Sequence, residues 1–394
     1  MKRIGIFGGT FNPPHAGHLR AAQFAQQALK LDKVLLIPGF RMPHKDSTSD
    51  DPTPCQRLQM LRLAVASWGG LEVSDLEIAR EGISYTWETV AQLREQYPDA
   101  KLYLLLGSDK FSSIAQWKNC DRIFAETVLV ALCRGEKDEL ARMESVQQTL
   151  HEMGAQTVVL ENTVTAITST DIRRLLAFGC VPEQLPEPVG RYIQANGLYG
   201  INKDCRQLPL DVLEQVVVSL LKPSRVAHVL GCRQTAVELA KRYGADETDA
   251  ARAALLHDIT KALDGPLQLT LCHAYGTMLD AFSADNPKTL HALTGSLVAD
   301  RIFGENAAVV AAIRWHTTGK QNMNLLEKII YVADYMEPNR DFSGVETLRQ
   351  LAYEDIDKAL KLGLQMTLDM LRRQMRQISP QSQEALAYLE SCGV

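Results

Sequence analysis

Short apolar runs alternate with longer amphipathic stretches through the first 200 residues. The apolar runs have the length of strands, and the stretches between them repeat their apolar residues at the spacing of a helix. The expected strands are Ile4–Phe7, Lys33–Ile37, Leu71–Val73, Lys101–Leu106, Thr127–Ala131 and Thr157–Leu160. The expected helices are His18–Leu31, Gln56–Ser67, Thr86–Gln96 and Glu139–Glu152. This alternation predicts an α/β fold with a parallel sheet, helices on both faces, and a ligand site at the carboxyl ends of the strands.

The pattern changes after Tyr199-Gly200, where β-rich segments almost disappear. Helical spacing in the second half predicts helices at Asp211–Leu221, Ser224–Tyr243, Thr248–Lys261, Leu290–Ile302, Ala307–His316, Leu325–Met336 and Ile356–Met375. We therefore predict an α/β domain at residues 1–200, a linker at 201–208 and an all-α domain at 209–394. The length of 394 residues agrees with two domains, because single cores rarely grow beyond about 250–300 residues.

Composition narrows the class of protein. The net charge of −5, with both signs mixed along the chain, leaves no basic surface for nucleic acid. The eight cysteines contain no Cys-x-x-Cys pair, which favours reduced thiols over a disulfide or zinc framework. No run approaches the roughly 18 apolar residues of a membrane span, and a strand begins at once in place of a signal peptide. The sequence predicts a cytoplasmic protein with no membrane partner and leaves its oligomeric state open.

The first expected strand leads into a segment rich in glycine, proline and histidine. It reads Gly8-Gly9-Thr10-Phe11-Asn12-Pro13-Pro14-His15-Ala16-Gly17-His18. Glycines let the backbone approach an anion closely. The free N–H groups and the dipole of the helix that begins here attract phosphate, and His15 and His18 share one helix face. The segment predicts a phosphate site, with a turn carrying two incidental histidines as the alternative.

Four further segments place polar or aromatic groups where strands end or helices begin. They are Arg41-Met42-Pro43-His44-Lys45, Ile83-Ser84-Tyr85-Thr86-Trp87, Gly107-Ser108-Asp109 followed by Trp117, and Ser169-Thr170-Asp171-Ile172-Arg173. The first of these segments is expected either to bind phosphate or to form a solvated surface. The last is expected to bind a second anion. In this order, after residues 8–18, they resemble the motifs of bacterial nicotinate-nucleotide adenylyltransferases, which are Rossmann-like enzymes of the nucleotidyltransferase superfamily. The resemblance covers residues 1–200.

This resemblance implies transfer of the adenylyl group of ATP, with Mg²⁺, to nicotinate mononucleotide, giving deamido-NAD and pyrophosphate. It implies charge-stabilising roles for His15, His18, Lys45 and Arg173. It also implies contacts to ATP or the pyridine nucleotide from Gly8, Gly9, Thr10, Phe11, His44, Tyr85, Thr86, Gly107, Asp109, Trp117, Ser169 and Thr170, with Tyr85 and Trp117 around the pyridine ring. Asn12 stands where many relatives have Asp, so we do not assign it to Mg²⁺. Nicotinamide mononucleotide stays open as the alternative acceptor.

Ionisable residues interrupt five apolar segments of the second half. They are His228, the pair His257-Asp258, His291, His316 and Asp334. Such groups are costly to bury unless they bind a metal or a partner. A single such histidine is more often a buried core residue with hydrogen-bond partners of its own. Five segments with the same feature predict a metal site.

The sequence motifs around these residues indicate the class of protein more specifically. It reads His-Asp-Ile-Thr-Lys at 257–261, His-Thr-Thr-Gly-Lys at 316–320 and Tyr-Val-Ala-Asp-Tyr-Met-Glu-Pro-Asn-Arg at 331–340. Residues 209–375 resemble the bacterial HD-domain hydrolases that cut diadenosine tetraphosphate symmetrically into two ADP. The resemblance implies two divalent transition metals, for which iron or manganese suits at least as well as zinc. The implied ligands are His228, His257, Asp258, His291, His316 and Asp334, with Asp258 bridging the two ions.

Two cations of the second half are candidate phosphate contacts. Lys261 follows His257 by one expected helical turn, and Arg340 follows Asp334. A solvated surface is the alternative for both. The helical half could also be a non-catalytic nucleotide sensor that regulates the transferase, or a phosphohydrolase for another nucleotide, although a complete ligand set favours catalysis.

Overall fold

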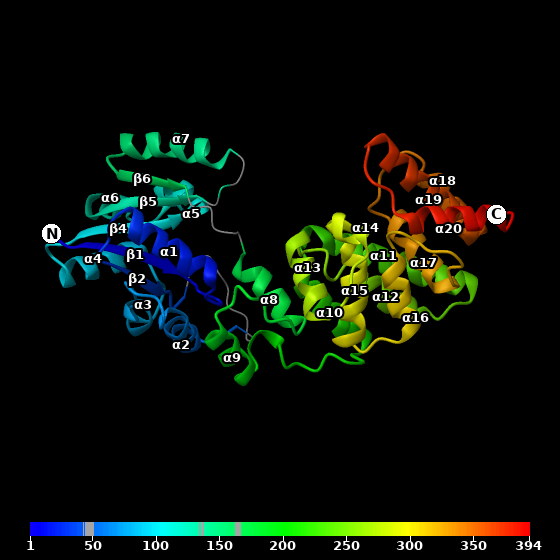
Figure 1. Ribbon diagram of the computed structural model, residues 1–394, viewed down its shortest axis with the longest axis horizontal. Coiled ribbons are helices and arrows are strands. Elements are labelled where there is room, and N and C mark those ends of the chain that lie inside the picture. Colours follow the sequence, from blue (N-terminus) through cyan, green and yellow to red (C-terminus); the bar gives the residue numbers. More distant parts are fainter. Residues whose placement is uncertain (42, 44–50, 134, 136–137, 162–166) are drawn as a thin grey trace. The chain divides into compact units, whose positions relative to one another are not determined.

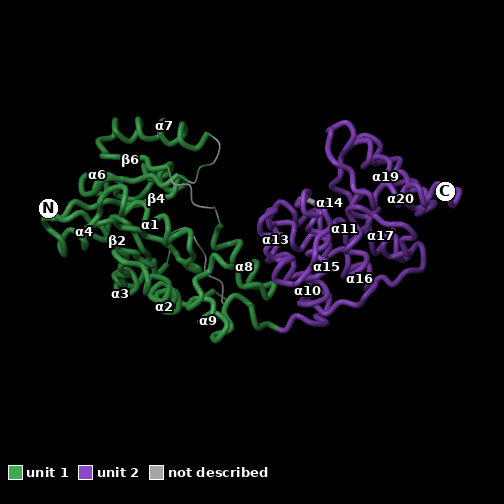
Figure 2. The backbone as a smooth tube through the Cα atoms, viewed as in Figure 1, with its two compact units in different colours: residues 1–203 green, residues 204–394 purple. Residues whose placement is uncertain are grey.

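The computed structural model describes residues 1–41, 43, 51–133, 135, 138–161 and 167–394. Contacts divide the chain into two compact units, Met1–Lys203 and Asp204–Val394, drawn in different colours in Figure 2. Each unit has buried apolar residues of its own.

A six-stranded parallel sheet organises the first unit (Figure 1). Its strands are β1 (Arg3–Gly9), β2 (Lys33–Pro38), β3 (Leu71–Val73), β4 (Lys101–Gly107), β5 (Thr127–Cys133) and β6 (Gln156–Glu161). They pair in the order β3-β2-β1-β4-β5-β6, all parallel. Strand addition reverses direction between β1 and β4, which is where open α/β sheets bind ligands. The predicted fold class is confirmed, and all six predicted strands are present.

Burial on both faces explains why these strands are apolar throughout. All of β5 is buried, as are the five inner residues of β4. The helices of this unit are α1 (Ala16–Ala28), α2 (Pro54–Val65), α3 (Leu76–Arg80), α4 (Thr86–Gln96), α5 (Ser108–Ser113), α6 (Cys120–Glu126), α7 (Glu139–Glu152), α8 (Ser169–Ala177) and α9 (Glu187–Ala195). The sequence did not predict α3, α5, α6 and α9, which are five to nine residues long and therefore make at most about two and a half helical turns.

The second unit is helical in its described secondary structure, and the predicted all-α class is confirmed. Its α-helices are α10 (Leu210–Leu220), α11 (Pro223–Tyr243), α12 (Glu247–Leu256), α13 (Gly265–Ala274), α14 (Ala281–Asp285), α15 (Leu290–Arg301), α16 (Ala307–Trp315), α17 (Leu325–Met336), α18 (Val345–Glu354), α19 (Ile356–Arg373) and α20 (Pro380–Ser391). The sequence missed α13, α14, α18 and α20. Two of them, α13 and α20, open on Gly265-Pro266 and Pro380, which resemble turn residues although proline fits the first turn of a helix.

One predicted boundary was wrong in a way that affects the site. The helix expected at Thr248–Lys261 ends at Leu256, so His257 and Asp258 lie in the turns that follow α12. Lys261 is also in these turns and not on a helix, which corrects its expected placement.

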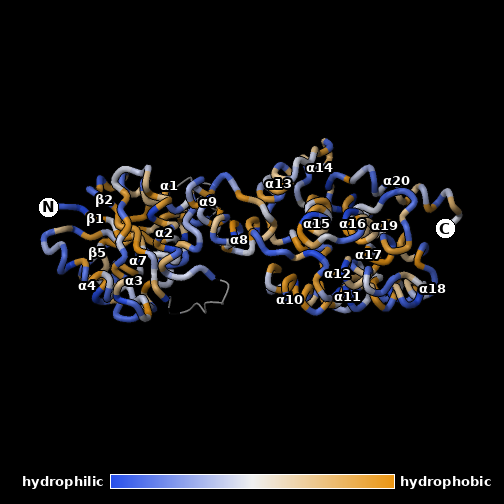
Figure 3. The backbone as a smooth tube through the Cα atoms, turned by 90° about the horizontal axis from the view of Figure 1, so that it is seen from below, coloured by the Kyte–Doolittle hydropathy of each residue, from blue (hydrophilic) through white to orange (hydrophobic). Residues whose placement is uncertain are grey.

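Apolar segments, orange in Figure 3, occur along the elements of both units. Within the described ranges, no helix combines the length and the apolar character needed to cross a membrane. All eight cysteines lie in the described ranges, and none of them forms a disulfide there.

Candidate active sites

A cavity of about 820 Å³ opens in the first unit at the switch point of the sheet. The end of β1, the beginning of α1, the end of β4 and the beginning of α8 all contribute to its lining. Its lining includes these residues singled out from the sequence: Gly8, Gly9, Thr10, Phe11, His15, His18, Gly107, Asp109, Ser169, Thr170 and Arg173. Residues as far apart in the sequence as Gly8 and Arg173, which are 165 positions apart, thus meet around one space.

The two histidines of the glycine-rich segment lie in contact at the beginning of α1, with their ring planes tilted by 36°. His15 is the residue before the helix and is 5% exposed, and its ring centroid lies 3.7 Å from that of His18. The backbone N–H of His15 donates to Nδ1 of His18 at 3.3 Å. Neutral imidazole carries one N–H, so in this arrangement His18 carries its proton on Nε2. His18 therefore presents a hydrogen-bond donor at a helix end that already favours anions.

Side chains from distant elements fix the backbone before α1. Arg173 on α8 donates to the carbonyl of Asn12 at 2.7 Å, and Ser169 donates to the carbonyl of Pro13 at 3.0 Å. The Asn12 side chain donates to Asp51 Oδ1 at 3.1 Å and accepts from Tyr199 at 2.6 Å. Because both ends of its amide are used within the protein, the arrangement supports leaving Asn12 out of any Mg²⁺ site.

Arg57 on α2 is a cavity residue that the sequence did not indicate. It is 5% exposed, and it donates to the carbonyls of Thr10 at 2.8 Å and Phe40 at 3.0 Å. Burial lowers the pKa of its guanidinium from the ordinary value. In the sequence it is one arginine in an amphipathic helix, where an arginine is usually a surface residue.

The residues expected around the pyridine ring do not belong to the described lining of this cavity. Trp117 is half-buried and packs against the apolar core of the sheet. Tyr85 directly precedes α4, which begins at Thr86, and the Lys118 ammonium lies 4.5 Å from the Tyr85 ring centroid. His44 and Lys45 lie outside the described residues. The expected roles of these residues stay predictions: Tyr85, Thr86 and Trp117 at the pyridine ring, and His44 and Lys45 at the substrates.

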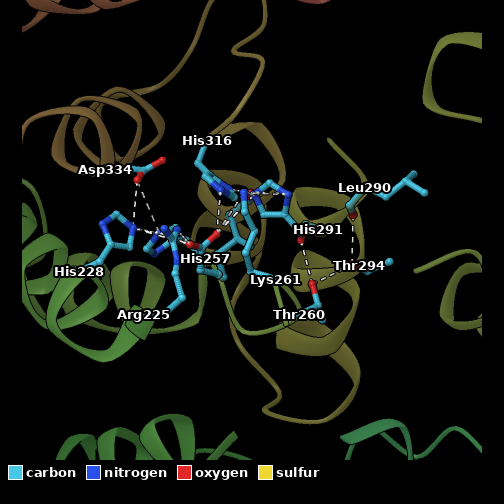
Figure 4. A network of polar contacts seen from close by, with 12 residues as sticks. Arg225, His228, His257, Thr260, Lys261, Leu290, His291, Thr294, His316 and Asp334 are labelled. Atoms are coloured by element: carbon cyan, nitrogen blue, oxygen red, sulfur yellow. Dashed lines mark hydrogen bonds and ion pairs between the residues drawn. The ribbon is translucent and has the colours of Figure 1, made fainter. Parts of the chain in front are cut away.

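In the second unit, five helices bring histidines and carboxylates to one point (Figure 4). His228 lies on α11, His257 and Asp258 follow α12, His291 lies on α15, His316 follows α16, and Asp334 lies on α17. Two groups have ligand atoms within 4.8 Å of one another: His228, His257 and Asp334, and His257, Asp258 and His316. The groups share His257.

Asp258, which is 1% exposed, lies between two pairs of histidines. Its Oδ2 lies 3.6 Å from Nε2 of both His228 and His257. Its Oδ1 lies 3.4 Å from Nε2 of His291 and 3.9 Å from Nε2 of His316. The two oxygens of this carboxylate therefore face different sets of nitrogen atoms, as a bridging ligand requires.

The hydrogen bonds of the histidines fit a divalent cation. Nδ1 of His257 donates to the carbonyl of Ala254, and Nδ1 of His316 donates to the carbonyl of Ile313, both at 2.7 Å. Their Nε2 atoms consequently direct lone pairs toward the Asp258 carboxylate, and Nε2 of His316 has no hydrogen-bond partner among the described residues. Buried lone pairs that face a carboxylate repel it unless a cation lies between them. Neutral imidazole with carboxylate oxygen is a donor set for transition metals.

Burial also keeps these imidazoles in the form that binds metal. Desolvation holds the pKa of His257 well below its ordinary value and lowers the pKa of His316 to about 4. A neutral histidine is the ligand form, so the metal-free protein needs no deprotonation of these residues at neutral pH.

The metal-free chain is expected to lose stability as the pH falls from about 6.5 toward 4. The unfolded chain binds protons at His257 and His316 near pH 6.5, whereas burial lowers the pKa of both residues in the folded protein. The unfolded state therefore binds more protons in this range, and stability rises with pH. Hydrogen–deuterium exchange of peptides from α12 and α16, corrected for intrinsic rates, measures this loss. Equal protection at pH 7 and pH 5 would contradict the expectation.

Three cations surround the cluster. The Lys261 ammonium donates to Nε2 of His291 at 2.9 Å, and burial lowers the pKa of Lys261 to about 8. Arg340 donates to Oδ1 of Asp334 at 2.6 Å. Arg225 on α11, which the sequence did not single out, donates to Oδ2 of Asp258. The expected phosphate contacts Lys261 and Arg340 thus lie directly beside the expected metal ligands.

The fold and the two sites together define a nucleotidyltransferase domain joined to a helical domain with an HD-type His/Asp cluster. A model of the cytidylyltransferase-like family matches residues 6–175, and a model of the HD domain matches residues 225–339. A protein of Mycoplasma pneumoniae named probable nicotinate-nucleotide adenylyltransferase/Ap4A hydrolase is 30% identical over 381 residues, covering 93% of this chain and 98% of that protein.

Two further proteins each match one half. A probable nicotinate-nucleotide adenylyltransferase of Desulfitobacterium hafniense is 38% identical over 201 residues, covering 51% of this chain and 97% of that protein. A crystal structure described as a predicted HD superfamily hydrolase involved in NAD metabolism from Clostridium acetobutylicum is 38% identical, covers 47% of this chain and 98% of its own, and has a TM-score of 0.46. The chain belongs to the family in which a nicotinate-nucleotide adenylyltransferase is joined to an HD-type hydrolase.

Proposed function

We propose that the first unit transfers the adenylyl group of ATP to nicotinate mononucleotide, giving deamido-NAD and pyrophosphate. One observation carries the proposal: the N-terminal ends of α1 and α8, with His15, His18, Thr170 and Arg173, open on one cavity. Two helix N-termini at one space favour a ligand with several phosphates. The names of the relatives support nicotinate mononucleotide as the acceptor.

The proposed reaction proceeds without a covalent intermediate. A phosphate oxygen of nicotinate mononucleotide attacks the α-phosphorus of ATP, and pyrophosphate leaves. Nε2–H of His18 donates to the triphosphate, while Arg173 and Lys45 stabilise negative charge that develops during transfer. Mg²⁺ enters as part of the ATP complex and shares this charge. Positioning and charge stabilisation supply the catalysis.

Formation of deamido-NAD by the purified chain from ATP and nicotinate mononucleotide tests the proposal. Nicotinamide mononucleotide, which differs in the ring amide, is the matched competing acceptor. A higher kcat/KM for the nicotinate form supports the assignment. A chain that forms no dinucleotide from either acceptor would contradict the proposal.

Replacing Trp117 by alanine is expected to weaken the binding of nicotinate mononucleotide more than the binding of ATP. A stacked aromatic pair contributes about 0.5–1.5 kcal/mol beyond burial, which corresponds to an increase of about 2- to 13-fold in the KM for the pyridine nucleotide. Steady-state kinetics with each substrate varied in turn measures the effect. Equal increases for both substrates, together with a lower Tm, would make Trp117 a core residue without contact to the ring.

We propose that the second unit hydrolyses diadenosine tetraphosphate symmetrically to two ADP with two divalent metal ions, iron or manganese. The arrangement that carries this proposal is the pair of ligand groups that share His257, with Asp258 of the second group also 3.6 Å from Nε2 of His228 in the first. Bound ions would supply an activated water molecule and neutralise the phosphate under attack. The oxygens of Asp258 face histidine nitrogens of both ligand groups, and His291 lies on the side that Oδ1 faces.

The cations beside the cluster are proposed to bind the polyphosphate. Lys261, with a pKa of about 8, is largely charged at neutral pH, and Arg225 and Arg340 carry permanent charge. Metal analysis of the purified chain and a hydrolysis assay after reconstitution with Mn²⁺ or Fe²⁺ test the proposal. A metal-loaded chain that binds diadenosine tetraphosphate and leaves it intact would identify a nucleotide sensor.

A further inference from the structure

We propose that Glu337 is a positioning residue that fixes the ring and the tautomer of His228 for metal binding. The inference rests on the proposed metal-dependent hydrolase. Oε1 of Glu337 lies 3.1 Å from Nδ1 of His228. A carboxylate accepts hydrogen bonds, so a neutral His228 that donates Nδ1–H to Glu337 keeps the lone pair on Nε2 for a metal ion.

That lone pair faces the cluster. Nε2 of His228 lies 3.2 Å from Oδ1 of Asp334 and 3.3 Å from Nε2 of His257. His257 and His316 obtain the same tautomer from backbone carbonyls three residues earlier in the chain. His228 instead takes its partner from a residue 109 positions away. A carboxylate partner also makes the imidazole a stronger ligand, because negative charge on one side raises the basicity of the other nitrogen.

Glu337 is itself held firmly. It directly follows α17 and is 1% exposed. Its Oε2 accepts from both the backbone N–H and the side-chain amide of Asn339, each at 2.8 Å. Arg349 on α18 donates to the Glu337 carbonyl at 2.9 Å. The two bonds to Oε2 and the bond to the backbone carbonyl together favour one orientation of the carboxylate, which places Oε1 at His228.

A glycine on the facing helix leaves room for this carboxylate. Gly231 lies three residues after His228 on α11, and a Cβ at this position would overlap Oε2 of Glu337. Glycine inside a helix is less stable than alanine by about 1 kcal/mol. The helix that carries His228 thus has no side chain at the point where the Glu337 carboxylate packs against it.

The test compares Mn²⁺ binding by the full chain and by Glu337→Gln, with free Mn²⁺ followed by electron paramagnetic resonance. Glutamine keeps the shape of the side chain and removes its charge. Loss of such a partner typically weakens metal binding by about 10–100-fold, and we expect a rise of this size in the Kd. The matched control is Glu327→Gln, which removes the charge of another buried carboxylate of α17 that contacts Lys320 and Asn324. Glu327→Gln is expected to leave the Kd unchanged.

A second variant, Gly231→Ala, keeps every charge and displaces the carboxylate. It is expected to raise the Kd for Mn²⁺ as well, and it tests the inference if Glu337→Gln fails to fold. Unchanged Mn²⁺ binding by a folded Glu337→Gln, even with a lower Tm, would overturn the positioning role and leave the proposed hydrolase intact. A wild-type chain that binds no Mn²⁺, Fe²⁺ or Zn²⁺ would overturn the metal-dependent function itself.

Discussion

Asp258→Ala is expected to eliminate hydrolysis of diadenosine tetraphosphate and to lower the metal content of the chain. Each oxygen of Asp258 faces a different pair of histidines, so its removal affects both ligand groups. Losing one preorganised electrostatic group costs about 10²–10³ in rate, and a group that serves two ions should reach or exceed the upper end of that range. Metal analysis and the rate of ADP release measure the two effects.

The matched control for this variant is Asp246→Ala. Asp246 caps the other end of α12 by accepting from the backbone of Asp249. Loss of that cap costs about 0.5–2 kcal/mol of stability and leaves the ligand groups intact. Both variants are expected to retain deamido-NAD synthesis. Normal hydrolysis by Asp258→Ala would remove this carboxylate from the mechanism.

His18→Ala is expected to lower deamido-NAD synthesis by about 10²–10³, the usual effect of removing one preorganised donor. Its Nδ1 accepts from the His15 backbone, which places the proton of a neutral ring on Nε2, the atom proposed to donate to the triphosphate. The rate of pyrophosphate release measures the loss, and hydrolysis by the second unit should be unchanged.

His151→Ala provides the comparison for His18→Ala. His151 is exposed on α7, where it contacts Thr157 at 2.6 Å, and it does not line the cavity. Its replacement is expected to leave the rates of both reactions at the wild-type level. Near-normal transferase activity in His18→Ala would show that the histidine pair does not act on the phosphates.

The sequence predicted the fold where one physical signal dominated. Strands buried on both faces are apolar throughout, and β4 and β5 are visible for that reason. Short helices such as α5 and α6 carry no such signal, since one or two turns cannot establish a period. The end of α12 was misplaced because Ile259 and Ala262 continue an apolar pattern although the chain has left the helix.

The sequence identified the ionisable groups of the second unit but could not show how they pair. Arg225 and Glu337 each lie three residues from an expected ligand, His228 and Asp334, and one helical turn is too common a spacing to single them out. Their importance depends on packing, because the partner of Arg225 is 33 positions away and that of Glu337 is 109 positions away. A buried arginine such as Arg57 is hidden for the same reason.

The proposal that the chain has two independent activities is tested most directly by the product profile of one reaction mixture. The mixture contains ATP, nicotinate mononucleotide and diadenosine tetraphosphate, with Mg²⁺ and Mn²⁺. The wild-type chain should produce deamido-NAD and ADP, His18→Ala should produce ADP without deamido-NAD, and Asp258→Ala should produce deamido-NAD without ADP. Loss of both products in either variant would contradict two independent sites. Release of AMP by the wild-type chain would contradict symmetric hydrolysis.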